Sequence, residues 1–217
     1  MIITIDGPAG TGKSTVAKLL AEKLGFVYLD TGAMYRAVTL YFLDNNINFD
    51  DEELIKSKMD EINITFNKTG TLLNNVDVSK EIRSDRVNKN VSQVSALKAV
   101  RDKLTSLQRK CAVNTSLVCE GRDMGSVVFP NAEHKFFLSA SVDVRAKRRY
   151  DEELQKGMQP DFYEIKKSIQ NRDNIDSNRD IAPLKKAEDA IEIDTSFLGI
   201  QDVLELLADY VEGKDVI

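Results

Sequence analysis

Nine residues near the start of the chain have the types and spacing of a phosphate-binding loop. They run Gly-Pro-Ala-Gly-Thr-Gly-Lys-Ser-Thr, and Gly7, Gly12, Lys13 and Ser14 occupy the fixed positions of the motif. Backbone N–H groups of such a loop turn inward and bind phosphate together with the positive end of the following helix. We therefore predict that Lys13 reaches the β- and γ-phosphates of a nucleotide and that the Ser14 hydroxyl holds Mg²⁺.

The sequence on both sides of the loop supports this prediction. Residues 2–5 form a short apolar run rich in β-branched residues, which is typical of a buried strand. After the loop, Val16, Leu19, Leu20 and Leu24 recur at helical spacing. The order strand, glycine loop, helix is the context that this motif requires. The loop alone does not distinguish a kinase from a switch or a motor.

Composition limits the classes of protein to consider. The chain has 217 residues, 42% hydrophobic and 30% charged, which suits one soluble domain with a small insertion. Its net charge of −5 does not favour nucleic-acid or membrane partners. We find no N-terminal signal pattern and only two cysteines, and we expect a monomer in the cytoplasm. The single histidine, His134, is predicted in a loop and leaves no histidine-rich metal site.

The chain alternates predicted strands with predicted helices, which indicates an α/β protein. We predict a P-loop NTPase-type parallel sheet flanked by helices, with ligands at the carboxyl ends of the strands. The core of this single kinase domain would comprise residues 1–59, 94–150 and 174–217. A small antiparallel β plus helix insertion, the expected monophosphate-binding region, would span 60–93, and a helical lid about 151–173.

The predicted insertion departs from the strand–helix alternation around it. Residues 62–66 alternate strictly between apolar and polar, 67–70 form a turn signal, and 71–78 contain a second extended stretch. This pattern predicts a β-hairpin. A helix is predicted over 81–91 and a longer one over 95–112.

Two absent motifs argue against a GTPase switch. No glycine has an aspartate three residues before it, so the aspartate-x-x-glycine element of switches is missing. Residues 67–70 and 88–91 begin as Asn-Lys but do not end in aspartate, as a guanine-binding motif would. A nucleotide-dependent switch or binding module is therefore the weaker alternative to a transferase.

The positions of the arginines favour a kinase whose acceptor is itself phosphorylated. Arg36 and Arg122 follow predicted strand ends, and Arg145, Arg148 and Arg149 share a helix face. Phosphoryl transfer depends on holding the acceptor in line and neutralising charge, and guanidinium groups do both through paired contacts to phosphate. An alternative within the enzymes is another small P-loop kinase that acts on AMP, UMP or a metabolite such as shikimate.

Four stretches together carry a resemblance to a known family. Residues 5–15, 29–36, 120–130 and 171–184 resemble bacterial cytidylate kinases, which are P-loop nucleoside monophosphate kinases. The Gly-Arg-Asp-Met-Gly and Arg-Asp-Ile-Ala-Pro-Leu segments are the most specific of these. The resemblance implies transfer of the γ-phosphoryl group of ATP, bound with Mg²⁺, to CMP or dCMP to give CDP or dCDP and ADP. Thr31 and Glu120 stand where serine and aspartate are common, and both keep the chemistry.

The resemblance also implies roles for individual residues. The residues expected to act in catalysis are Lys13, Arg36, Arg122 and Arg179. Those expected to bind ATP are Gly7, Pro8, Ala9, Gly10, Thr11, Gly12, Lys13, Ser14 and Thr15, with Arg148 and Arg149 from the lid. For CMP they are Ser92, Arg101 and Asp123 at the base, Arg36, Arg122 and Arg179 at the phosphate, Arg172 and Asp176 at the ribose, and Thr31 and Tyr35 around the monophosphate.

Overall fold

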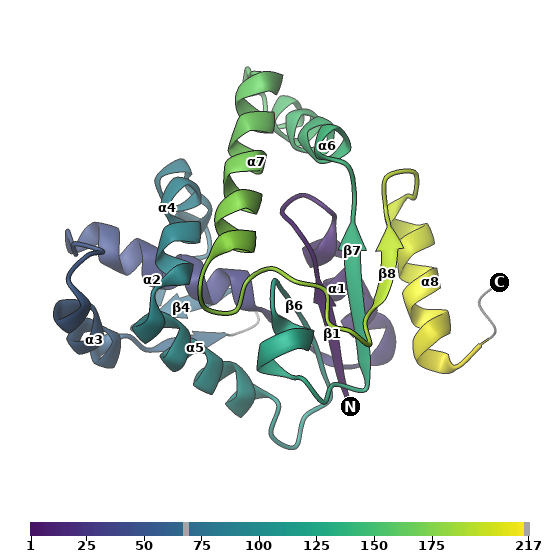
Figure 1. The fold of residues 1–217 in the computed structure, drawn as a ribbon, viewed down its shortest axis with the longest axis horizontal. Helices are drawn as coiled ribbons and strands as arrows, with labels where there is room; N and C mark the ends of the chain where they lie inside the picture. Colours follow the sequence, from purple (N-terminus) through teal and green to yellow (C-terminus); the bar gives the residue numbers. More distant parts are fainter. Residues whose placement is uncertain (67–69, 215–217) are drawn as a thin grey trace. The chain divides into compact units, whose positions relative to one another are not determined.

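The chain folds as two compact units, seen in a computed structural model that describes residues 1–66 and 70–214 (Figure 1). The core unit comprises 1–29 and 112–217, and the inserted unit comprises 30–111. The inserted unit is larger than the predicted insertion of 60–93. The reason is that α2 (Thr31–Asp44) and α5 (Lys98–Cys111) pack against α4 (Asp85–Ala96), so they belong with the insertion.

The core unit is built on the predicted parallel sheet. Its five strands lie in the order β2-β6-β1-β7-β8, and every pair whose register is described is parallel. Their bounds are β1 (Ile2–Asp6), β2 (Val27–Asp30), β6 (Leu117–Gly121), β7 (His134–Ser139) and β8 (Ile191–Asp194). His134 opens β7 opposite Ile3, so the prediction of a loop there was wrong. The phosphate-binding loop follows β1, the central strand.

Helices cover this sheet and its strand ends. They are α1 (Lys13–Leu24), α6 (Val142–Gln155), α7 (Phe162–Asn178), α8 (Ile200–Glu212) and the π-helical turn η2 (Met124–Val128). Fully buried Ile3, Ile5, Val118 and Leu138 form the centre of the apolar cluster that α1 and α8 close. No helix in the described part of the chain is long and apolar enough to cross a membrane.

The inserted unit combines helices with a small antiparallel sheet. Its strands are β3 (Ile64–Phe66), β4 (Thr71–Leu73) and β5 (Val76–Asp77), in that order. The predicted extended stretch over 71–78 is thus two strands, because Asn74 and Asn75 adopt left-handed backbone conformations and form a tight turn. The predicted turn at 67–70 falls mostly on 67–69, which lie outside the described residues.

Two predicted helices of the inserted unit have different bounds in the structure. The helix predicted over 81–91 is the 3₁₀ turn η1 (Glu81–Arg83) followed by α4, because Ser84 is extended. The helix predicted over 95–112 is α5, which begins at Lys98, because Leu97 is extended and ends α4. α3 (Glu52–Glu61) is capped by Asp51, whose side chain accepts a hydrogen bond from the backbone N–H of Leu54.

Candidate active site

The backbone of the phosphate-binding loop is held in a conformation that only glycine permits. At Gly7, φ is +147°, and a Cβ atom there would lie 2.1 Å from the carbonyl oxygen of Leu138 on β7. Gly12, which precedes α1, has φ of +89°. These positive φ values place the loop at the N-terminus of α1, where its N–H groups can face an anion.

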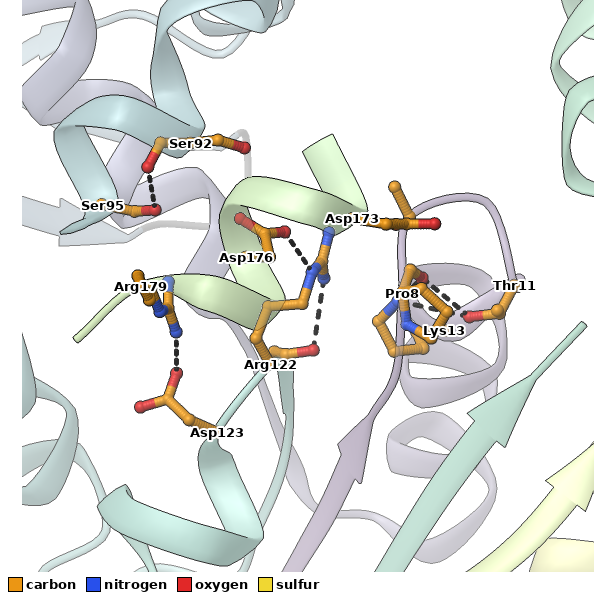
Figure 2. A network of polar contacts seen from close by, with 12 residues as sticks. Pro8, Thr11, Lys13, Ser92, Ser95, Arg122, Asp123, Asp173, Asp176 and Arg179 are labelled. Atoms are coloured by element: carbon orange, nitrogen blue, oxygen red, sulfur yellow. Dashed lines mark hydrogen bonds and ion pairs between the residues drawn. The ribbon is translucent and has the colours of Figure 1, made fainter. Parts of the chain in front are cut away.

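Lys13 is folded back onto this loop. Its Nζ donates to the carbonyl oxygen of Pro8 at 2.6 Å and to Oγ1 of Thr11 at 3.2 Å, and the residue is 4% exposed (Figure 2). Burial, together with the nearby positive charge of Arg122, lowers the pKa of Lys13 to about 7. Glu120 and Asp6 only partly offset this lowering of the pKa, and a phosphate in the loop would add a further counter-charge.

Ser14 has the position expected of a magnesium ligand. It is exposed, follows Lys13 at the start of α1, and its Oγ donates to Oε1 of Glu120 at 2.5 Å. The described residues contain no group of three or more His, Cys, Asp or Glu side chains that could hold a metal. A hydroxyl with a carboxylate behind it suits Mg²⁺, which is held by few protein groups and completes its shell with phosphate oxygens and water.

Two ion pairs join the segment after β6 to the end of α7. Nε of Arg122 donates to Oδ2 of Asp176 at 3.0 Å, and a guanidinium nitrogen of Arg179 lies 3.1 Å from Oδ1 of Asp123 (Figure 2). Asp123 and Arg179 expose only 2% and 4% of their side chains. Four residues predicted to bind CMP are therefore together within the core unit.

The charges around Arg122 are of both signs: burial alone would lower its pKa, but Asp176, Glu120 and Asp173 outweigh burial and raise it. Burial alone would raise the pKa of Asp176, but Arg122, Arg172 and Arg179 outweigh it and hold that pKa below its usual range. Burial and the charge of Arg122 lower the pKa of Arg172, whose Nε is buried without a hydrogen-bond partner in the described part of the chain. A cluster of this kind suits a polyanionic ligand.

The arginines of α6 differ in what they contact. Arg145 is 4% exposed; it donates to the carbonyl oxygen of Ala9 at 2.9 Å and pairs with Asp173 at 2.6 Å. Arg148 donates to Thr195 after β8, and Arg149 pairs with Glu153 on its own helix. Sequence spacing alone could not show which of these three arginines lies near the phosphate-binding loop. In the structure it is Arg145, which was not among the residues predicted to bind ATP.

In the inserted unit, the residues predicted to contact the base lie together. The guanidinium carbon of Arg101 sits 5.6 Å from the centroid of the Tyr35 ring, and Arg101 donates to the carbonyl oxygen of Ser95 at 3.2 Å. Ser95 Oγ donates in turn to the carbonyl oxygen of Ser92 at 2.9 Å (Figure 2). Ser92 Oγ is buried and has no hydrogen-bond partner among the described residues, so it remains available to a ligand.

Arg36 and Thr31 both lie on α2. Arg36 donates to the carbonyl oxygen of Ile82 at 3.3 Å and to Oδ1 of Asn88. Thr31 is the buried first residue of the helix, and Asp30 before it accepts from the backbone N–H of Ala33 at 2.8 Å. Asn88 was not singled out from the sequence, because nothing local marks it as a partner of a residue 52 positions away.

Asp6, at the end of β1, is a second residue that the sequence did not single out. Its two carboxylate oxygens accept from the backbone N–H groups of Met124 and Gly125 at 2.9 and 2.8 Å. Burial raises the pKa of Asp6 to about 7, although these two hydrogen bonds oppose the rise. The only available signal was its place before Gly7, which also fits a simple strand end.

This raised pKa has a measurable effect on stability. We expect the free energy of unfolding of the wild type to fall relative to that of Asp6→Asn as the pH rises from about 4 to about 8, by up to ~4 kcal/mol. The unfolded carboxyl titrates near 3.8 and the folded one near 7, so the contribution is complete below pH 3.8 and lost as the pH rises through 7. Urea unfolding of both proteins across this range measures it. A difference that does not change with pH would contradict the raised pKa.

The sequence is similar to known proteins over almost its whole length. The family model described as cytidylate kinase matches residues 3–213. The cytidylate kinase of Fusobacterium nucleatum subsp. nucleatum is 51% identical over 212 residues, which covers 98% of this chain and 97% of that protein. The cytidylate kinase of Halalkalibacterium halodurans is 49% identical over 218 residues, covering 99% and 98%.

Solved structures support the fold alone. An uncharacterized protein from Eubacterium ventriosum has a TM-score of 0.55 at 15% identity, and the match covers 99% of both chains. A Thermus thermophilus protein has a TM-score of 0.50 at 16% identity, covering 98% of this chain and 96% of that one. The family model and the relatives match almost the whole sequence, and the relatives are about 50% identical to it. The chain therefore belongs to the cytidylate kinase family.

Proposed function

We propose that the chain transfers the γ-phosphoryl group of ATP to CMP or dCMP, giving CDP or dCDP and ADP, and that the residues described above bind the two nucleotides. Family membership supports the reaction. The observation that carries the assignment of the site is the buried pair of Asp123 and Arg179. It places a carboxylate suited to an amino group beside a guanidinium suited to phosphate within one unit.

Asp123 is proposed to select cytosine. The exocyclic amine of cytosine donates hydrogen bonds, and a carboxylate accepts them as it does from the same amine in DNA. Uracil presents a carbonyl at this position, which would leave the buried carboxylate facing another acceptor. Ser92, with its unpartnered hydroxyl, and Arg101 are proposed to meet the acceptors N3 and O2 of the ring.

The positive groups are proposed to hold and align the phosphates. Arg36, Arg122 and Arg179 would bind the α-phosphate of CMP, while Lys13 and the loop of residues 7–15 would bind ATP. Ser14 would help to hold Mg²⁺, which would supply charge that neutralises the phosphates. The acceptor phosphate is already ionised at neutral pH, so no general base is needed.

The remaining assignments complete the proposal. We propose that Asp176 and Arg172 address the ribose hydroxyls and that Thr31 and Tyr35 flank the monophosphate. We also propose that Arg145 takes part in ATP binding, which is supported by its hydrogen bond to the carbonyl oxygen of Ala9 in the loop. We also propose that the chain acts in the cytoplasm as a monomer, without a nucleic-acid or membrane partner. Sedimentation of the purified protein would test the oligomeric state.

The test is ADP production from Mg-ATP with CMP, dCMP, UMP, AMP or no acceptor. We expect strong stimulation by the two cytidine nucleotides and little by the others. Asp123→Asn keeps the size of the side chain but turns one acceptor into a donor, so it should lower kcat/KM for CMP by ~10²-fold or more. Steady-state rates with each acceptor give these values.

A matched control and a contradicting result follow from the structure. Asp189 is an exposed aspartate paired with Lys135, and Asp189→Asn should leave all five rates unchanged. Stimulation by AMP or UMP instead of CMP would keep the kinase fold and reject the assigned substrate. Slow ATP hydrolysis that no acceptor accelerates would indicate a nucleotide-dependent switch.

A further inference from the structure

The turn that follows Asp123 lacks a cap from its own sequence. η2 (Met124–Val128) has Asp123 as its N-cap residue, but the Asp123 side chain forms no capping hydrogen bond. That side chain pairs with Arg179. The first two N–H groups of the turn, from Met124 and Gly125, donate to Asp6 on β1. Asp6 therefore does, from another strand, what a capping residue does locally.

The hydrogen-bond geometry fixes the turn from several sides. Each oxygen of Asp6 accepts one N–H group, at 2.9 and 2.8 Å, and Asp6 is 5% exposed. The carbonyl oxygen of Asp123 accepts from the N–H groups of Val127 and Val128 at 2.9 and 3.1 Å. The peptide group between Asp123 and Met124 is thus held at both its carbonyl and its N–H, so the direction of the Asp123 side chain depends on Asp6.

Close packing leaves the turn no room to shift. A Cβ atom on Gly125 would lie 2.8 Å from Oγ1 of Thr4, which is on β1 two residues before Asp6. It would also lie 3.3 Å from the Lys135 side chain on β7. Gly125 therefore rests directly on the sheet, and the two hydrogen bonds to Asp6 are the polar part of that contact.

We propose that Asp6 is a positioning residue for base selection: it anchors Met124 and Gly125 and so holds the Asp123 carboxylate where it accepts from the amine of cytosine. This inference rests on the role proposed above for Asp123. Asp6 does not touch the nucleotide. Each carboxylate oxygen accepts one of the two N–H groups, whereas the amide of asparagine offers only one acceptor oxygen.

The experiment compares kcat/KM for CMP and for UMP in the wild type and in Asp6→Asn. The amide has nearly the same shape but presents a donor to one of the two N–H groups, so the turn should move. We expect the ratio of CMP to UMP kcat/KM to fall about tenfold or more, mainly through KM for CMP, with KM for ATP changed less than about twofold. A merely structural loss would reduce the active fraction for both acceptors equally and leave the ratio unchanged.

Two further variants make the test specific. Thr4→Val keeps the shape beside Gly125 and lies on the same face of β1 as Asp6, and it should leave the ratio unchanged. In the Asp123→Asn background, Asp6→Asn should have no further effect on the ratio, because the two residues act through one contact. Full additivity of the two effects would overturn the proposal.

The outcomes separate this inference from the proposed function. A wild type that does not prefer CMP rejects the role of Asp123 itself. A wild type that prefers CMP, with an unchanged preference in Asp6→Asn, rejects only the positioning role. If Asp6→Asn does not fold, Gly125→Ala displaces the same turn from the other side, and an unchanged ratio in that variant also overturns the proposal.

Discussion

Lys13→Met should lower kcat for CMP phosphorylation by ~10²–10³-fold while leaving the nucleotide-free protein at least as stable at pH 7. The ammonium group is buried near Arg122, and its contacts are neutral oxygens of Pro8 and Thr11. The charges of Glu120 and Asp6 only partly offset the desolvation of this ammonium group, so removing it relieves a net cost. Removing it from a complex with ATP deletes the group that neutralises the transferring phosphoryl. Steady-state kinetics and thermal unfolding measure the two effects.

Lys18 provides the matched control for this substitution. It is an exposed lysine on the same helix α1, five residues further on. Lys18→Met should change neither kcat nor the unfolding temperature appreciably. A Lys13→Met protein that keeps more than about a tenth of the wild-type kcat would contradict the role given to this residue. A protein that unfolds at a much lower temperature would contradict the cost assigned to burying its charge.

Arg122→Met should strongly destabilise the protein. Its side chain is 18% exposed and pairs at 3.0 Å with Asp176, which is 4% exposed. Breaking such a pair leaves a buried carboxylate undercompensated, so we expect a loss of ~3 kcal/mol of unfolding free energy. Because the same guanidinium is proposed to bind the phosphate of CMP, kcat/KM for CMP should fall by ~10²-fold as well.

A double variant separates these two effects. Adding Asp176→Asn to Arg122→Met removes the stranded charge, so it should restore much of the stability without restoring activity. Arg86→Met is the control: Arg86 pairs with Asp44 at 2.6 Å, but both side chains are about half exposed, and its loss should have little effect on stability. Recovery of activity in the double variant would show that Arg122 acts only by neutralising Asp176.

The fold could be predicted from sequence where the signal is local. The loop at residues 7–15 carries its own glycines, and β1, β2 and β7 each contain a short apolar run and lead into a helix. Errors fell where one backbone conformation interrupts a continuous pattern. Ser84 and Leu97 are extended, and neither has a residue type that requires it, so the helices predicted over 81–91 and 95–112 began too early.

The candidate site could be predicted only as a set of residue types. Arg122, Asp123, Asp176 and Arg179 were predicted as site residues from the sequence. In the structure they form two ion pairs, although more than 50 positions separate the partners in each pair. Residues that hold others in place were not found. Asp6 contacts backbone groups 118 and 119 positions away, and Asp6 carries no local mark of that contact. Contacts of this kind depend on which strands are neighbours in the sheet, so they can be identified only once the strand order is known.

The strand order of the parallel sheet indicates which segment of the chain could be exchanged as a unit. Residues 30–111 leave the core unit after β2 and return before β6, and these two strands are neighbours in the sheet. The N–H of Val27 donates to the carbonyl oxygen of Ser116 at 3.0 Å, so the two connections start from adjoining strands. Eighty or so residues can therefore be treated as one cassette, bounded by two nearby splice points. Exchanging that cassette between relatives would replace the proposed acceptor residues Arg36, Ser92 and Arg101 and keep those of the core unit, without altering the strand order of the parallel sheet.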